Sequence, residues 1–252
     1  ALSSAASDVY KRQDMYTSDS LGYWQYRNAK GEYANPRALT MDGKKQVIVG
    51  LDGTSEGVQV AFLLPDTETG EMTQTLITQV LAQPEDGTQL LCRGLKCLAI
   101  GGVRYLYVLT SDGKDTTEAA SESKANYDRV YRYIVTVNKD TRALTLDTAF
   151  GINEAGTKGG GYAVVKVASG LNTEGDSSVA ELYGVDVRSD GAVFIGCGNN
   201  RTNAVVLSAD GASGLGKLYD NNNDAWTPNG PIALVEDAYL CLLYTSDAAD
   251  DK

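Results

Sequence analysis

Residues Leu182–Gly211 read LYGVDVRSDGAVFIGCGNNRTNAVVLSADG, and this stretch decides the fold. Tyr183, Val185 and Val187 alternate with polar or small residues, as in a strand that has one buried face and one face in water. Val193–Gly196 is β-branched and aromatic, so it suits a strand that is buried on both faces. The two runs predict neighbouring strands of one sheet.

Short turns separate the apolar runs of this stretch. Asp190-Gly191 follows the first run, and Asp210-Gly211 follows a third run at 204–207. Glycine accepts a positive φ angle, and aspartate accepts hydrogen bonds from the backbone of its own turn. The connections are too short for a helix, so the stretch predicts an antiparallel meander, as in a propeller blade or the edge of a β-sandwich.

The same pattern of strands and turns occurs at 38–70 and, with a polar insertion, at 98–141. A further apolar run, Pro231–Val235, begins another copy. A repeated meander needs neighbouring copies to cover its faces. We therefore predict an all-β fold of antiparallel meander repeats, a partial β-propeller with about three blades and a truncated fourth. The predicted units span 38–74, 75–160, 161–229 and 230–240, within a single domain over 14–240.

The two ends of the chain differ in character from the rest. Residues 3–13, SSAASDVYKRQ, resemble the translation of a sequencing-library adapter, and residues 241–251, CLLYTSDAADD, resemble the translation of its opposite strand. The alternative is that both are ordinary termini. We expect 1–13 and 241–252 to be adapter sequence, and the natural protein to be truncated at both joins.

Composition and charge exclude several classes of function. The chain has 252 residues, 42% hydrophobic residues, 27 Gly and 5 Pro, which describes a globular β protein. Its net charge of −11 argues against a nucleic-acid partner. The sequence contains no histidine, which excludes Ser-His-Asp and Cys-His catalysis and His-ligated metals. Apolar runs stay below the roughly 20 residues of a membrane span.

Leu146–Gly151 reads LDTAFG, and here the chain resembles the delta-60 type of β-propeller repeat, which occurs in bacterial and archaeal extracellular proteins. GVDVRSDGAVFIG at 184–196 and ALTMDGKKQVIVG at 38–50 are similar to the strand–turn–strand part of that repeat. The resemblance covers most of 39–224, although no unit carries the full signature. It implies a propeller from a secreted or surface-displayed microbial protein, and no particular activity.

Two short motifs suggest chemistry that their context does not support. Gly53–Gly57, GTSEG, matches the G-x-S-x-G nucleophile elbow as a string, but a strand follows it, so we predict a hairpin loop. Asp220, Asn222 and Asp224 occupy the first, third and fifth positions of a calcium loop. Ala225 replaces the glycine that such loops need at the sixth position. The alternatives at 220–224 are a calcium site and a plain polar turn.

The cysteines and aromatic residues each leave two interpretations open. Cys92 and Cys97 either close a hairpin disulfide or are two buried thiols. Cys197 follows a buried run and is expected to be a small core residue. The aromatic-rich segment 14–35 either packs on the first strands or offers a platform for a sugar ring.

Carboxylate pairs remain possible acid–base catalysts in a chain without histidine. Asp112, Asp115, Asp186 and Asp190 lie near predicted strand ends and are the candidates. Gathered in one place they would indicate a glycoside hydrolase or lyase; spread singly over turns they would indicate a scaffold. We predict a non-catalytic binding or structural module, extracellular or at the cell surface, with a protein or glycan partner. A propeller glycoside hydrolase or lyase is a second possible function, and a fibre-like structural protein is a third.

Overall fold

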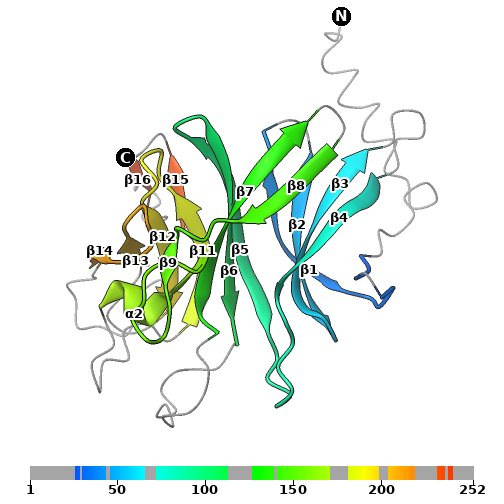
Figure 1. Ribbon diagram of the computed structural model, residues 1–252, viewed down its shortest axis with the longest axis horizontal. Coiled ribbons are helices and arrows are strands. Elements are labelled where there is room, and N and C mark those ends of the chain that lie inside the picture. Colours follow the sequence, from blue (N-terminus) through cyan, green and yellow to red (C-terminus); the bar gives the residue numbers. More distant parts are fainter. Residues whose placement is uncertain are drawn as a thin grey trace, which may run out of the picture.

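The computed structural model shows an all-β protein built from antiparallel sheets (Figure 1). Its sheets follow one another along the chain, so each sheet comes from one continuous part of the sequence. The structure describes residues 26–28, 30–43, 46–65, 72–112, 127–138, 141–170, 181–198, 204–218, 232–235 and 238–240.

Sheet 1 is a four-stranded meander in the order of the sequence. Gly57 has a φ of +76°, and a Cβ atom on it would lie 2.3 Å from the Leu81 carbonyl oxygen, so the hairpin after Thr54 requires glycine there. The prediction that 53–57 is a hairpin loop is therefore confirmed. The strands are β1 (Asn35–Met41), β2 (Val47–Thr54), β3 (Gly57–Pro65) and β4 (Met72–Leu81).

Sheet 2 begins with the same meander and adds two short strands. Its third strand, β7, has β6 on one edge and shares the other edge between β8 and β10. The strands are β5 (Leu91–Ile100), β6 (Val103–Ser111), β7 (Arg129–Asn138), β8 (Thr141–Leu146), β9 (Gly151–Ile152) and β10 (Tyr162–Val164).

Sheet 3 contains the stretch that predicts the fold, and that prediction is confirmed. Its first three strands are antiparallel neighbours, and Val193, Phe194 and Ile195 are fully buried, as a strand covered on both faces requires. A two-stranded sheet 4 follows. The strands of sheets 3 and 4 are β11 (Glu181–Val187), β12 (Val193–Gly198), β13 (Ala204–Leu207), β14 (Gly214–Leu218), β15 (Ala233–Val235) and β16 (Ala238–Leu240).

Two predicted boundaries between units differ from the observed sheets. Thr75–Leu81 was expected to open the second unit, but it lies in β4 and pairs with β3 of sheet 1. Tyr162–Ala168 was expected to open the third unit. Instead β10 pairs with β7 of sheet 2, and the single-turn helix α2 (Val165–Ser169) follows, ending at Gly170 with a φ of +70°. The apolar pattern within each of these two segments fits pairing with the sheet before it as well as with the sheet after it. The sequence pattern alone therefore does not identify the sheet that each segment joins.

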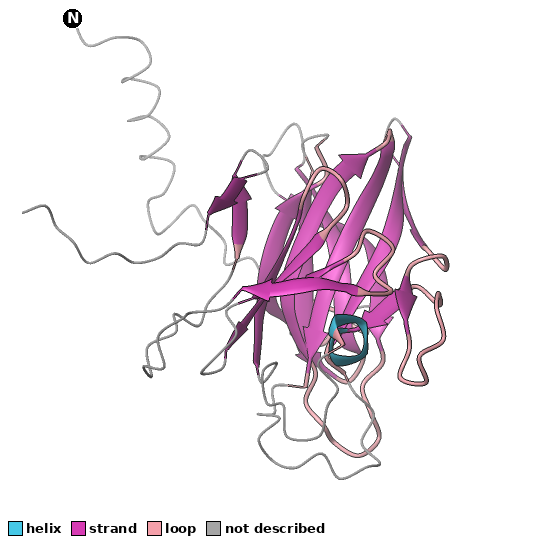
Figure 2. Ribbon diagram, turned by 90° about the vertical axis from the view of Figure 1, so that its left-hand side faces the viewer, coloured by secondary structure: helices cyan, strands magenta, loops and turns pink. Residues whose placement is uncertain are grey.

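The first strands of successive sheets lie side by side. β5 contacts β1 on one side and β11 on the other, and β11 in turn contacts β15. One apolar core, which includes Ile48, Phe62 and Val108, lies between sheets 1 and 2. A second, which includes Leu109 and Ile195, lies between sheets 2 and 3. Figure 2 shows the twisted sheets packed face to face, with α2 beside them.

The segment Leu146–Gly151 joins sheet 2 to sheet 3. Gly151 donates its N–H to the Asp210 carbonyl oxygen at 2.7 Å, across to the turn before β14. Phe150 is fully buried, and its ring makes an edge-to-face contact with the ring of Tyr107. Arg132 pairs with Asp147 at 2.7 Å, lies over the Phe150 ring, and donates to the Ala209 carbonyl oxygen. This clasp, formed by Asp147, Phe150, Gly151 and Arg132 with the turn at 208–211, fixes sheet 3 against sheet 2.

Candidate functional site

A β-bulge near the start of each first strand makes the three main sheets comparable residue by residue. Arg37, Arg93 and Tyr183 are the extra residues in β1, β5 and β11, because the register shifts across each of them. Two residues before the bulge, the first strand pairs with Asp52 in sheet 1 and with Ser111 in sheet 2, through Asn35 and Leu91 respectively. These positions lie at the end of the sheets where the first strands begin.

Asp52 is a buried carboxylate at the boundary between sheets 1 and 2. Its side chain is fully buried, and Arg37 donates from Nε to both of its oxygens at 3.1 Å. The backbone N–H of Cys92, in β5, donates to its Oδ2 at 3.1 Å. One carboxylate therefore satisfies an arginine of its own sheet and a backbone group of the next sheet.

At the position of this carboxylate, sheet 2 has Ser111, and the buried carboxylate comes instead from Asp128. Asp128 precedes β7, is 4% exposed, and interacts with the Ser111 hydroxyl. Arg93 lies within electrostatic range, and its Nε is buried without a hydrogen-bond partner among the described residues. The Asp128 backbone carbonyl accepts the N–H of Val165, which ties the start of β7 to α2.

Burial raises the pKa of Asp128 to about 6, well above its usual range. The Ser111 hydrogen bond lowers that pKa, the nearby Asp112 carboxylate raises it, and Lys166 and Arg93 lower it. Desolvation is the largest of these effects, because the side chain has almost no contact with water. Asp128 therefore changes its charge around pH 6.

Asp112 and Asp128 form the carboxyl pair closest in character to an acid–base couple. A carboxyl group with a pKa near 6 that has a second carboxyl group close by suits general acid–base chemistry in principle. Asp128 is nevertheless buried beneath the sheet end, so its carboxyl group is not presented to a substrate among the described residues. The arrangement suits a structural role better than a catalytic one.

Asp186 lies at the boundary of sheets 2, 3 and 4. Its Oδ1 pairs with Lys96 of β5 at 2.6 Å, and its Oδ2 accepts the N–H of Leu234 in β15 at 2.7 Å. Thr40 occupies the same register position in β1, and its hydroxyl oxygen accepts the N–H of Cys97 in β5 at 3.1 Å. Lys96 is the third residue at this position. We call Thr40, Lys96 and Asp186 the tether residues, since each contacts the first strand of the next sheet.

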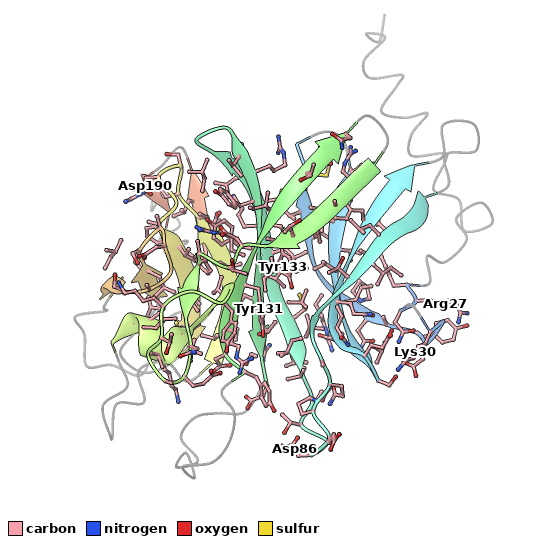
Figure 3. The ribbon with its side chains drawn as sticks, in the orientation of Figure 1. Arg27, Lys30, Asp86, Tyr131, Tyr133 and Asp190 are labelled. Atoms are coloured by element: carbon pink, nitrogen blue, oxygen red, sulfur yellow. The ribbon has the colours of Figure 1, made fainter. Side chains whose placement is uncertain are left out.

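Arg129 is surrounded by tyrosines at the start of β7, where β7 pairs with β10. Its guanidinium carbon lies 4.6 Å from the centre of the Tyr162 ring and 5.7 Å from that of Tyr127, and Nη1 donates to the Tyr131 hydroxyl at 3.2 Å. Glu154 pairs with Arg129 and accepts from the Tyr162 hydroxyl. These contacts hold β10 against β7, and Tyr131 lies near the middle of the molecule in Figure 3.

The predicted carboxylates do not come together. Asp190 is an exposed turn residue whose Oδ1 accepts the Ala192 N–H at 3.0 Å, and Arg188 holds its pKa down to about 2. Asp186 is a tether residue, Asp112 lies near Asp128, and Asp115 is outside the described residues.

The predicted calcium ligands, Asp220, Asn222 and Asp224, also lie outside the described residues. Among the residues that the structure does describe, no three His, Cys, Asp or Glu side chains are grouped so as to hold a metal ion. The same part of the chain contains no helix that is long and apolar enough to cross a bilayer.

Of the two interpretations of Cys92 and Cys97, the hairpin disulfide is wrong. Cys92 and Cys97 lie in one continuous strand, β5, whose extended backbone keeps residues five positions apart out of bonding range, and both thiols are free. Burial raises the pKa of Cys92 to about 12 and that of Cys97 to about 11. Cys92 is fully buried and Cys97 is half-buried. Cys197 is buried, which confirms its assignment to the core.

Sequence reasoning missed Asp52 and Asp128. A signal for Asp52 was present, because it stands alone inside an apolar strand, and such a residue is expected to be paired. Asp128 had no comparable signal, since it follows a polar insertion and resembles any loop residue. No protein-family model matches the sequence, and no curated protein is significantly similar to it.

Proposed function

We propose that this chain is a non-catalytic binding or structural module, formed by radial stacking of meander sheets as part of a β-propeller. We further propose that it belongs to a secreted or surface-displayed microbial protein. That location rests on the resemblance of LDTAFG and the Asp-Gly repeats to delta-60 propeller repeats. The partner we propose is a protein or a glycan.

The packing of the first strands supports the propeller arrangement. In a propeller the first strand of each blade lies innermost, so first strands of successive blades are neighbours. Here β1, β5, β11 and β15 adjoin in that order. The tether residues supply an independent argument, because one register position makes the contact to the next sheet at each boundary.

The buried carboxylates form contacts between sheets, and this observation carries the proposal that the module is non-catalytic. Asp52 and Asp186 each satisfy groups on two sheets, and Asp42 pairs with Arg142 of β8 at 2.8 Å. Asp147 belongs to the clasp. These carboxylates thus fasten contacts between sheets, Asp52 and Asp42 at the boundary of sheets 1 and 2 and Asp186 at those of sheet 3, whereas a glycosidase needs two of them flanking one bond.

The enzyme alternative depends on Asp112 and Asp128. The negative charge of Asp112 raises the pKa of Asp128 in addition to burial, as in acid–base pairs. The low exposure of Asp128 argues against that use.

A comparison of Asp52→Asn and Asp186→Asn with Asp190→Asn tests the proposal. Asparagine keeps an acceptor oxygen but removes the charge that Arg37 and Lys96 neutralise. We expect each of the first two variants to lose about 1–3 kcal/mol of unfolding free energy. Asp190→Asn should change stability little, because its side chain is 56% exposed. Thermal and urea unfolding measure all three.

A parallel screen with chromogenic glycosides and unsaturated-product absorbance tests for hydrolase and lyase activity. We expect no turnover. Turnover that Asp112→Asn or Asp128→Asn abolishes, in variants at least as stable as the wild type, would show that the pair is catalytic and that the module is an enzyme.

A further inference from the structure

The turn between β4 and β5 contains an Asp-Gly pair in unusually open surroundings. Asp86 and Gly87 are both exposed, and Asp86 lies at the tip of this turn, at the bottom of Figure 3. The Oδ1 atom of Asp86 accepts the N–H of Thr88 at 2.9 Å. The Gly87 N–H donates to the Pro84 carbonyl oxygen at 3.4 Å, which is long for such a bond. The Gly87 nitrogen is therefore only weakly held.

An Asp-Gly pair rearranges without an enzyme when its backbone is free to turn. The glycine nitrogen attacks the side-chain carboxyl carbon of the aspartate, and one water molecule leaves, so that a cyclic succinimide forms. Glycine favours this step because it has no Cβ atom beside the attacking nitrogen. The step requires the nitrogen to give up its hydrogen bond and the backbone to rotate, so tight packing around the glycine opposes it.

Packing restrains the glycine in the other Asp-Gly pairs of which the structure describes both residues. Nothing lies within 4 Å of the position that a Cβ atom on Gly87 would take. At the other glycines a Cβ atom would meet a neighbouring residue: Arg104 at 2.4 Å for Gly43, Asn35 at 2.2 Å for Gly53, Ala209 at 2.9 Å for Gly191 and Phe150 at 2.4 Å for Gly211.

Hydrogen bonds and ion pairs restrain these other pairs further. Asp42 and Asp52 are fully buried, and each is paired with an arginine. Gly191 and Gly211 donate their N–H groups to backbone carbonyl oxygens at 2.9 Å and 2.8 Å, so both nitrogens are firmly bonded. The turn at Asp86 and Gly87 has neither kind of restraint on the attacking nitrogen.

The charge state of the carboxyl group adds to this difference, because only the neutral group loses water readily. Arg188 holds the pKa of Asp190 down to about 2, and the Ser208 hydroxyl lowers the pKa of Asp210. At pH 7 the neutral fraction of Asp190 is therefore more than about tenfold below that of an aspartate with the ordinary pKa of 3.8. Both turns should form the succinimide slowly.

We propose that Asp86 is a modification site, at which the exposed turn rearranges to isoaspartate. Water opens the succinimide at either of its two carbonyl carbons. Addition at the side-chain carbon restores aspartate. Addition at the backbone carbon breaks the bond from that carbon to the Gly87 nitrogen, which stays bonded to the side-chain carbon. One water molecule leaves and one returns, and the α-carboxyl group of residue 86 is released at the surface.

The rearrangement changes the connection between sheets 1 and 2 locally. The side-chain carboxyl group that accepts the Thr88 N–H becomes part of the backbone, so this bond is lost. Thr88 itself is 7% exposed, and its carbonyl oxygen accepts from Gln83 Nε2 at 2.6 Å, which keeps the base of the turn in place. The released carboxylate is the group that isoaspartate-specific carboxyl methyltransferases esterify with S-adenosylmethionine. We expect an enzyme of this class to methylate the aged chain at residue 86.

Storage of the whole chain for several weeks at neutral pH, in water enriched in oxygen-18, tests the proposal. Ring opening places one oxygen-18 atom in the product, and peptide mapping by tandem mass spectrometry locates this atom and distinguishes isoaspartate from aspartate. We expect label at residue 86 to accumulate at least about tenfold faster than at Asp190. Treatment with an isoaspartyl methyltransferase and labelled S-adenosylmethionine should mark the same peptide.

Substitutions in the turn test the chemistry. Asp86→Glu should abolish the label at this turn, because glutamate would have to close a larger and less favourable ring. Gly87→Ala should slow labelling about tenfold, or about 1.4 kcal/mol of activation free energy, since the new Cβ atom crowds the attacking nitrogen. Asp190→Glu is the matched control in another exposed Asp-Gly turn, and it should leave the rate at Asp86 unchanged.

The chain unfolded in urea supplies the reference for the folded surroundings. There Asp86, Asp190 and Asp210 should react at similar rates, because each has lost its packing and its hydrogen bonds. A folded chain in which Asp86 reacts no faster than Asp190 overturns the proposal, as does one in which Asp86 stays unlabelled while the unfolded chain reacts. Neither result bears on the proposed module, because none of the tether residues takes part.

Discussion

Among single residues, Asp128 has the largest consequence for how the protein responds to pH. Its pKa rises from 3.8 to about 6 because it is buried, so the folded state binds its proton more tightly than the unfolded state does. The resulting stabilisation is complete below about pH 4 and is lost as the pH rises to about 6. Near neutral pH the protein holds a buried charge that Arg93 and Lys166 only partly compensate.

Asp128→Asn should therefore stabilise the protein at pH 7, by at most about 3 kcal/mol, and remove the decline between about pH 4 and 6. Urea unfolding at intervals of pH measures both effects. Asp190→Asn is the control of opposite sign: the wild-type stabilisation from Asp190 is small because the side chain is exposed, is present above about pH 3.8 and is lost toward pH 2. A variant at Asp128 with the wild-type pH profile would show that this carboxyl group is not the buried titrating group.

Among the elements, the clasp between sheets 2 and 3 depends on a glycine. Gly211 has a φ of +68°, and a Cβ atom on it would lie 2.4 Å from the Phe150 ring. Gly211→Ala should therefore cost the strain of a left-handed alanine, about 1–2 kcal/mol, and a further 1–3 kcal/mol, approximately, from overpacking. Thermal unfolding measures the sum.

Gly87→Ala isolates the second contribution. Gly87 lies in an equivalent Asp-Gly turn with a φ of +75°, and nothing lies within 4 Å of its Cβ position. The Gly87→Ala variant should therefore lose only the unfolding free energy that corresponds to the backbone strain. Equal losses for Gly87→Ala and Gly211→Ala would show that Phe150 moves aside and that the clasp is not tightly packed.

The sequence predicts elements better than it predicts their partners. The strands at Tyr183–Val187, Val193–Gly196 and 204–207 are confirmed, because alternation and Asp-Gly turns are local properties. The assignments of Thr75–Leu81 and Tyr162–Ala168 to the next unit were wrong, since nothing local distinguishes a strand that closes one sheet from a strand that opens the next. Asp128 was missed for the same reason: its burial arises from Ser111 and from α2 behind it.

In the whole molecule, each sheet is stabilised chiefly by the sheets beside it. Sheet 2 contributes to the cores on both of its faces, whereas sheet 4 is a two-stranded hairpin held by the Asp186–Leu234 bond and packing against β11. Stacked repeats of this kind derive their stability from nearest-neighbour interfaces. We therefore expect a sheet with fewer faces covered by neighbouring sheets to open before a sheet with more covered faces.

Hydrogen exchange followed by mass spectrometry tests that order. We expect amides of β15 and β16 to exchange first and those of β5, β6 and β7 to exchange last, with sheets 1 and 3 between them. Asp186→Ala should accelerate exchange in β15 and β11 without affecting β1, because it removes the tether at that boundary. Thr40→Val is the mirror control and should accelerate exchange in β1 and the adjoining part of β5. If either variant changes all sheets equally, the molecule opens as one cooperative unit, and the tether residues do not act boundary by boundary.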